Sequence, residues 1–149
     1  NYGLNLTERL NKTVKITLST AILCSMVVMS VFVLFPKVLV GLFVNLDGEA
    51  ARIAVKGFPL FATGFIFFTT NLSAIGYFQS VEKVKPSLWF SLMRGCIFLV
   101  PSFFLLPELF GTKGIWLAMP LSELLTCICI VAYYCWNRIA ETKYHRETI

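Results

Sequence analysis

Two charged side chains, Arg94 and Glu123, lie inside long apolar stretches of the sequence. A charge at the centre of a membrane-spanning helix costs roughly 2.5–3.5 kcal/mol, so such a residue normally faces protein or water and has a partner. Counted along their helices, Arg94 lies about 10 Å and Glu123 roughly 18 Å from the same membrane surface, a difference that an arginine stem can bridge. We therefore expect a pair, acting either as a structural tie between helices or as part of a proton or cation site at Glu123.

A stripe of hydroxyl groups occupies another apolar stretch, with Asn71 close by. Its members are Thr63, Thr70, Ser73 and Tyr77, whose spacing puts them on one face of a helix. Small hydroxyl residues favour helix–helix contacts in membranes, but the same face could line an aqueous cavity, and both readings stay open. The phenylalanines of this stretch would suit an organic cation through cation–π attraction.

Metal and nucleophile chemistry find no support in the sequence. The five cysteines fall in apolar stretches, and the single histidine lies near the polar C-terminal end. Cys127 and Cys129 point about 200° apart on a helix, so they cannot share a metal ion. We expect the cysteines to be packing residues, and we expect no metal site, no cofactor and no enzymatic activity.

The elements that must position these residues are long apolar helices. The chain of 149 residues is 57% hydrophobic and 14% charged, against about 25% charged in soluble domains, which excludes a soluble enzyme, a nucleic-acid module and a disordered segment. A hydrocarbon layer of roughly 30 Å needs about 20 apolar residues. The sequence therefore predicts an all-α integral membrane protein with four transmembrane helices, at about 14–35, 51–78, 87–106 and 115–136, and a polar tail at 137–149.

Three prolines, Pro59, Pro101 and Pro120, fall inside the last three predicted helices. Each removes a backbone N–H group, and in a membrane the freed carbonyl must find another partner. We expect bends near them, the last one a single turn from Glu123.

Lysine and arginine are unequally divided between the two ends of the predicted helices. The first segment, the loop between the second and third helices and the tail together carry eight, whereas the other end carries four: Lys37, Arg52, Lys56 and Lys113. The positive-inside rule then places both termini in the cytoplasm. This bias also accounts for the net charge of +5, so we expect the lipid bilayer, and not nucleic acid, as the partner.

The order of several short motifs resembles the C-terminal part of the multidrug and toxin extrusion (MATE) family. The matching runs are NYG at 1–3, LFPKVLVGLF at 34–43, GFPLF at 57–61, GYFQSVEKVKPS at 76–87 and SLMRGCIFLVPSFFLLPELFGTKGIWLAMPLSELL at 91–125. The resemblance implies a twelve-helix transporter of two lobes, with residues 1–149 forming most of the C-terminal lobe. Since the chain begins with Asn1 and not Met, we expect a piece of a longer protein whose partner is the N-terminal lobe of the same chain.

The resemblance also implies an activity: export of organic cations, including drugs, by alternating access, in antiport with Na⁺ or H⁺ across the plasma (inner) membrane. It carries over Gln79, Arg94 and Glu123 as intramembrane polar or coupling positions, and leaves the coupling ion open. Some members have an acidic cation ligand in the helix that matches 51–78, where this chain has no Asp or Glu after Glu49.

Two alternatives remain. A lipid-linked oligosaccharide flippase of the same superfamily would need several Arg or Lys in its cavity to bind a polyanionic headgroup, and the apolar stretches offer only Arg94. A small structural membrane protein of four helices is the other.

Overall fold

The computed structural model describes the backbone of residues 7–147 and the side chains of residues 8–137. This part of the chain is helical and contains no strand. Its elements are α1 (Thr7–Leu34), α2 (Pro36–Gly41), α3 (Glu49–Ala62), α4 (Gly64–Ser80), α5 (Val84–Leu92), a π-helical turn η1 (Met93–Ile97), α6 (Leu99–Phe110) and α7 (Thr112–Glu147). The predicted all-α fold is confirmed.

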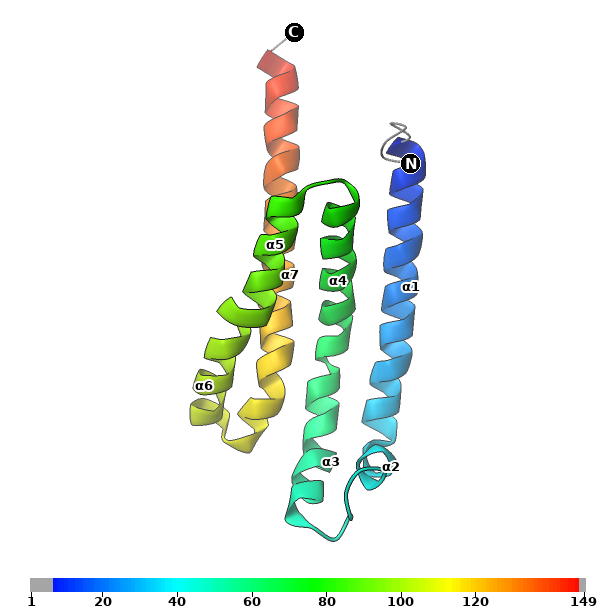
Figure 1. Cartoon of the computed structure of the whole chain (residues 1–149), viewed down its shortest axis with the longest axis vertical. Coiled ribbons are helices and arrows are strands. Elements are labelled where there is room, and N and C mark those ends of the chain that lie inside the picture. Colours follow the sequence, from blue (N-terminus) through cyan, green and yellow to red (C-terminus); the bar gives the residue numbers. More distant parts are fainter. Residues whose placement is uncertain (1–6, 148–149) are drawn as a thin grey trace.

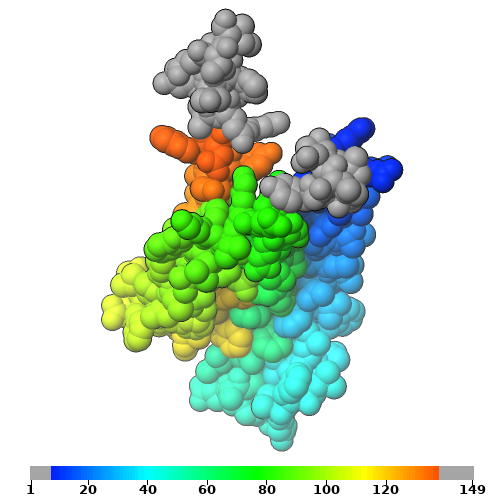
Figure 2. Space-filling view, turned by 45° about the horizontal axis from the view of Figure 1, so that its top comes forward, coloured from blue at the N-terminus to red at the C-terminus, as the bar shows by residue number. Residues whose placement is uncertain are grey.

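The long helices run side by side, as Figure 1 shows. The α3–α4 segment lies in the middle, and α4 packs against both α1 and α7. The α5–α6 segment packs along α7. In the space-filling view of Figure 2, α1 forms one edge of the molecule and α5 and α6 the opposite edge.

Three segments are long and apolar enough to cross a membrane: Glu8–Leu34, Val84–Phe110 and Thr112–Asn137. Helices α3 and α4 make a fourth if they count as one span with a 45° bend. Much of the apolar surface stays exposed, above all on α1. Lipid or further helices must cover that surface, because monomeric soluble proteins rarely expose apolar patches larger than a few hundred Å².

The predicted second helix is broken, but not at Pro59. The break falls at Thr63, one turn later, where the N–H and the hydroxyl of Thr63 both donate to the carbonyl of Leu60. Helix α4 then starts at Gly64, where a Cβ atom would lie only 3.1 Å from Cα of Pro120 on α7. The bend thus lies where the absence of a side chain lets two backbones approach.

The predicted third helix contains a π-helical turn instead of a simple bend. Pro101 has no N–H group to offer the carbonyl of Ile97, four residues earlier. Just before it, the N–H of Phe98 bonds to the carbonyl of Met93, five residues back, at 2.9 Å. This π turn contains Arg94.

Two helices extend beyond the predicted spans. Helix α7 does not end at residue 136 but continues to Glu147, so most of the predicted tail 137–149 is helical. The sequence of residues 137–149 lacks Gly and Pro and is rich in good helix formers, which explains the extension. Helix α1 likewise begins at Thr7 and not near residue 14. The motif at residues 1–3 lies outside the described residues.

The α3–α4 span meets α7 along positions seven residues apart. Gly57 contacts Trp116, and Gly64 contacts Pro120. Further along, Asn71 bonds to Glu123, and the ring of Phe78 lies 5.7 Å from that of Tyr133. All four α3–α4 positions are buried. A seven-residue repeat is the interval at which two helices stay in contact, so this seam holds the two spans side by side.

Candidate functional site

Glu123 is the centre of a polar cluster inside the helical bundle. Glu123 as a whole is only 4% exposed. Nε of Arg94 lies 3.0 Å from Oε1 of Glu123, and Nδ2 of Asn71 donates to Oε2 at 2.8 Å. The expected pair of Arg94 and Glu123 is therefore present, with Asn71 as a third member. The Arg94–Glu123–Asn71 cluster joins α4, η1 and α7.

Asn71 is fully buried on α4. Besides the carboxylate, its Nδ2 reaches the backbone carbonyl of Glu123 at 2.8 Å. Its Oδ1 has no hydrogen-bond partner among the described residues. Because buried polar side-chain atoms are nearly always paired, this oxygen marks an unfilled acceptor beside a carboxylate.

The π turn shapes the surroundings of Arg94. In an α-helix the N–H of Phe98 would bond to the carbonyl of Arg94, but here it bonds to Met93. The carbonyl of Arg94 instead accepts a hydrogen bond of 2.9 Å from the hydroxyl of Ser122 on α7. A second link between η1 and α7 thus lies next to the ion pair.

The guanidinium group of Arg94 also contacts an aromatic ring. Its Cζ lies 4.5 Å from the ring centroid of Phe68 on α4, within the range of a cation–π interaction. The side chain is 22% exposed, more than that of Glu123. Arg94 is therefore held by a carboxylate and a ring and still reaches the surface of the helical bundle.

The hydroxyls of Thr63, Thr70 and Ser73 in the predicted stripe donate to backbone carbonyls of their own span. Thr63 donates to Leu60 across the break. Thr70 donates to the carbonyl four residues before it at 2.7 Å, and Ser73 does so at 2.8 Å. Such back-bonding neutralises a hydroxyl without a partner helix, so these groups do not join the cluster.

Gln79 and Tyr77 also lie away from the cluster. Gln79 is exposed near the end of α4. Tyr77 packs against an apolar core formed by Ile75, Phe78, Phe90 and Ile130.

Sequence reasoning missed Ser122 and treated Phe68 only as one of several phenylalanines. Ser122 is fully buried, and its position next to Glu123 in the sequence was the one available signal. No group of three or more His, Cys, Asp or Glu residues that could hold a metal ion occurs among the described residues, and all five cysteines are free thiols.

These features define a multi-pass helical membrane protein with an ion pair between its spans, in which Glu123 is buried and Arg94 is partly exposed. The family model named MatE matches residues 1–104, and the chain belongs to the MatE family of transporters. This match includes Asn71 and Arg94, whereas Glu123 lies beyond it.

One solved structure, named protein A, superposes with a TM-score of 0.82 at 31% sequence identity. The match covers 93% of this chain and 31% of protein A, so the chain spans about a third of the length of that protein. No curated protein matches the chain.

Proposed function

We propose that the transporter containing this chain exports organic cations, including drugs, by alternating access in antiport with Na⁺ or H⁺. The MatE match over residues 1–104 carries this proposal. In it, the chain supplies most of one lobe, both termini of the segment face the cytoplasm, and the membrane is the plasma membrane. The exposed apolar face of α1 supports a role within a larger helical assembly.

Within that transporter the Arg94–Glu123–Asn71 cluster is a tie that lets the lobe move as one body. Alternating access is largely the rocking of one helical bundle against another, which requires that each bundle keep its internal contacts. Both carboxylate oxygens of Glu123 have partners, one on η1 and one on α4. A low-dielectric surrounding strengthens such contacts, and unpairing them inside a membrane is costly.

A second candidate role is a cation site at Glu123. Oδ1 of Asn71 favours it, because this buried acceptor has no partner among the described residues and lies on the side chain that bonds to the carboxylate. Carbonyl and carboxylate oxygens are the groups that replace the hydration shell of an alkali cation. The neighbouring guanidinium of Arg94 opposes it, since a second cation would be repelled.

The flippase alternative has weaker support. A polyanionic headgroup needs several unpaired cations inside the cavity. Among the described spans, the cation well inside the apolar region is Arg94, and Glu123 already pairs with it.

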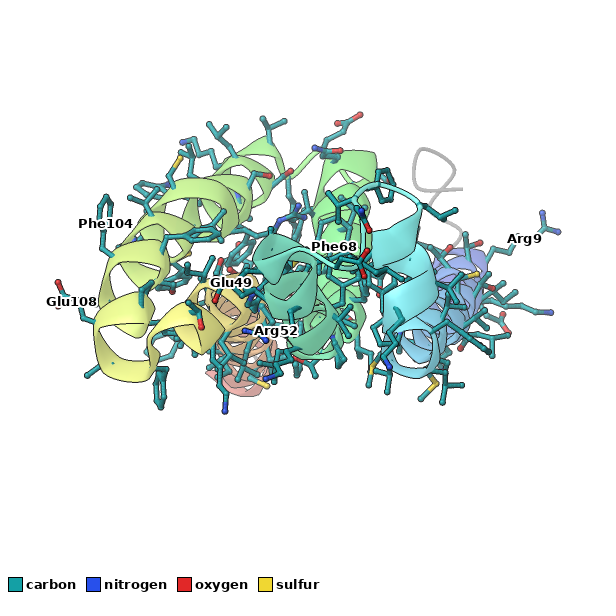
Figure 3. All side chains as sticks on the ribbon, turned by 90° about the horizontal axis from the view of Figure 1, so that it is seen from below. Arg9, Glu49, Arg52, Phe68, Phe104 and Glu108 are labelled. Carbon is teal, nitrogen blue, oxygen red and sulfur yellow. The ribbon has the colours of Figure 1, made fainter. Side chains whose placement is uncertain are left out.

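The deciding experiment uses the full-length transporter in proteoliposomes loaded with a fluorescent organic cation. Efflux is driven in turn by a Na⁺ gradient and by a H⁺ gradient, for the wild type and for Glu123→Gln. Glu108→Gln is the matched control, because Glu108 is exposed on α6 and points away from the bundle (Figure 3). Efflux by the wild type under neither gradient would refute the proposed export.

The two roles of Glu123 predict different results. For a tie, Glu123→Gln lowers the melting temperature and the amount of folded protein, while the remaining efflux keeps its ion dependence. For a coupling site, abundance and melting temperature stay normal and efflux no longer responds to the ion gradient. Normal stability together with normal coupled efflux would exclude both roles.

A further inference from the structure

A cavity of about 230 Å³ lies between α3 and the first turns of α7, away from the Arg94–Glu123–Asn71 cluster. Arg52 and Lys56 of α3 line one side together with Ile53, Gly57 and Leu60, which extend over most of that helix, and Thr112, Lys113 and Trp116 of α7 line the other. Both helices begin at the end of the bundle opposite the start of α1 (Figure 1). Figure 3, which views the chain from that end, shows Arg52 beside the start of α7.

The cavity gathers positive charge. This end of the molecule carries four Lys or Arg residues, and three of them line the cavity, Lys37 being the exception. No acidic side chain lines it. Glu49 lies 3.7 Å from Arg52, but both side chains are more than 70% exposed, and such surface pairs contribute little. Arg52, Lys56 and Lys113 are exposed, so water and salt screen their mutual repulsion, and an anion between them would reduce it further.

The backbone adds to this preference for an anion. Helix α7 begins at Thr112, and its first turn carries the positive end of the helix dipole. The N–H of Gly114 already bonds to the carbonyl of Gly111, so the N–H groups of Thr112 and Lys113 are the ones that an anion could meet. Thr112, which carries a hydroxyl group, also lines the cavity. Ammonium, guanidinium, hydroxyl and backbone N–H groups together are the donors that proteins use for phosphate oxygens.

Trp116 places the cavity at the membrane surface. Its indole packs against α3 at Gly57, where a Cβ atom would overlap the ring. Tryptophan gathers at the level of the lipid headgroups, and Trp116 lies one turn from the start of its span. A lipid phosphate can therefore reach the space between Lys56 and Lys113 without leaving the bilayer surface.

We propose that this α3–α7 cavity binds a phosphate group, either that of an anionic phospholipid headgroup or free inorganic phosphate. The site shares no residue with the cluster at Glu123. A bound phosphate would bridge α3 to α7 and so hold the first half of the bent span against the rest of the lobe.

The test measures binding to the purified full-length transporter in detergent, with native mass spectrometry for lipids and thermal shift for phosphate. The probes are phosphatidylglycerol, phosphatidylcholine and inorganic phosphate, each added alone. The variant is Lys56→Gln combined with Lys113→Gln, and Lys37→Gln, which lies at the same end outside the cavity, is the control. We expect phosphatidylglycerol retention to weaken by roughly fivefold per neutralised cation, with no change for the control.

The outcomes separate the sources. Retention of phosphatidylglycerol over phosphatidylcholine, lost in the double variant, supports a lipid phosphate. Saturable stabilisation by inorganic phosphate, lost in the same variant, supports the free anion. Binding that the double variant retains, or that Lys37→Gln weakens equally, would overturn the proposal. Lys56→Arg with Lys113→Arg keeps the charges and should restore binding, which guards against a variant that merely unfolds.

Discussion

Replacing Arg94 with glutamine tests how much the ion pair with Glu123 contributes to the free energy of unfolding. The substitution removes the cation 3.0 Å from Oε1 of Glu123 and leaves the hydrogen bond from Asn71. Removing one partner of a buried pair costs roughly 3–5 kcal/mol. Because Arg94 is 22% exposed and Glu123 keeps one donor, we expect the lower end, about 3 kcal/mol.

The double variant Arg94→Gln with Glu123→Gln separates the cost of an unpaired carboxylate from the cost of losing the contact. Two neutral amides leave no unpaired charge, so the double variant should be more stable than Arg94→Gln alone. A double-mutant cycle then gives the coupling between the two side chains, expected at about 1–3 kcal/mol for residues in contact. Arg52→Gln is the control, because the exposed pair with Glu49 should contribute at most about 1 kcal/mol.

The assay is chemical unfolding of the full-length transporter in detergent, followed by tryptophan fluorescence. The free energies of unfolding are compared between variants that share the same slope of free energy against denaturant concentration. Two results would refute the reasoning. One is an Arg94→Gln variant as stable as Arg52→Gln, and the other is a double variant that loses the sum of the two single changes. Either would mean that the contact between Arg94 and Glu123 carries no free energy in the folded lobe.

Three further outcomes are expected. Ser122→Ala removes the bond to the carbonyl of Arg94 and should cost about 1 kcal/mol of unfolding free energy, measured by the same assay. Gly57→Ala should destabilise by about 1–3 kcal/mol through overlap with the packed indole, whereas Gly76→Ala, with open space around it, should be neutral or stabilising by up to about 1 kcal/mol. Ser80→Cys, in a background without the native cysteines, should react with a membrane-impermeant thiol reagent only from the cytoplasmic side.

The spans and the ion pair could be predicted from the sequence because both follow from counting along a helix. Apolar length gives the spans, and the depth of a charge gives its possible partner. The depths of Arg94 and Glu123 were enough to bring the two together. The depth of a residue in the membrane does not define the rotation of its helix about the helix axis, so the sequence could not show which face of α4 meets α7.

That missing rotation explains why the sequence could not separate the direction of Asn71 from that of the hydroxyl stripe. Asn71 follows Thr70 directly and lies two residues before Ser73, but successive residues on a helix point about 100° apart. The hydroxyls turn back to their own helix, and Asn71 alone faces Glu123.

The exact positions of the backbone irregularities also could not be predicted from the sequence. Proline marked the approximate places of the bend at Thr63 and of the π turn at Met93–Ile97, but the exact residue depended on packing. The bend follows the contact of Gly64 with Pro120, which is a property of two helices together. The π turn leaves the carbonyl of Arg94 to accept the hydroxyl of Ser122, a partner that no single-helix pattern reveals.

The seam between α3–α4 and α7 gives Asn71 a role that can be separated from Glu123. On α3–α4 this seam consists of Gly57, Gly64, Asn71 and Phe78, each seven residues after the one before. A single polar residue in such a seam fixes the register of the two helices, because any slip leaves its amide unpaired in an apolar surrounding.

Asn71→Leu should therefore loosen the register as well as cost about 1–3 kcal/mol from the lost donor to Oε2 of Glu123. Spin labels at Leu72 and Leu124, both exposed on α4 and α7, would report the distance between the helices. We expect a narrow distribution in the wild type and a broad one in Asn71→Leu, with Glu123→Gln, which keeps an acceptor for the amide, closer to the wild type. A distribution for Asn71→Leu as narrow as that of the wild type would show that glycine packing alone sets the register.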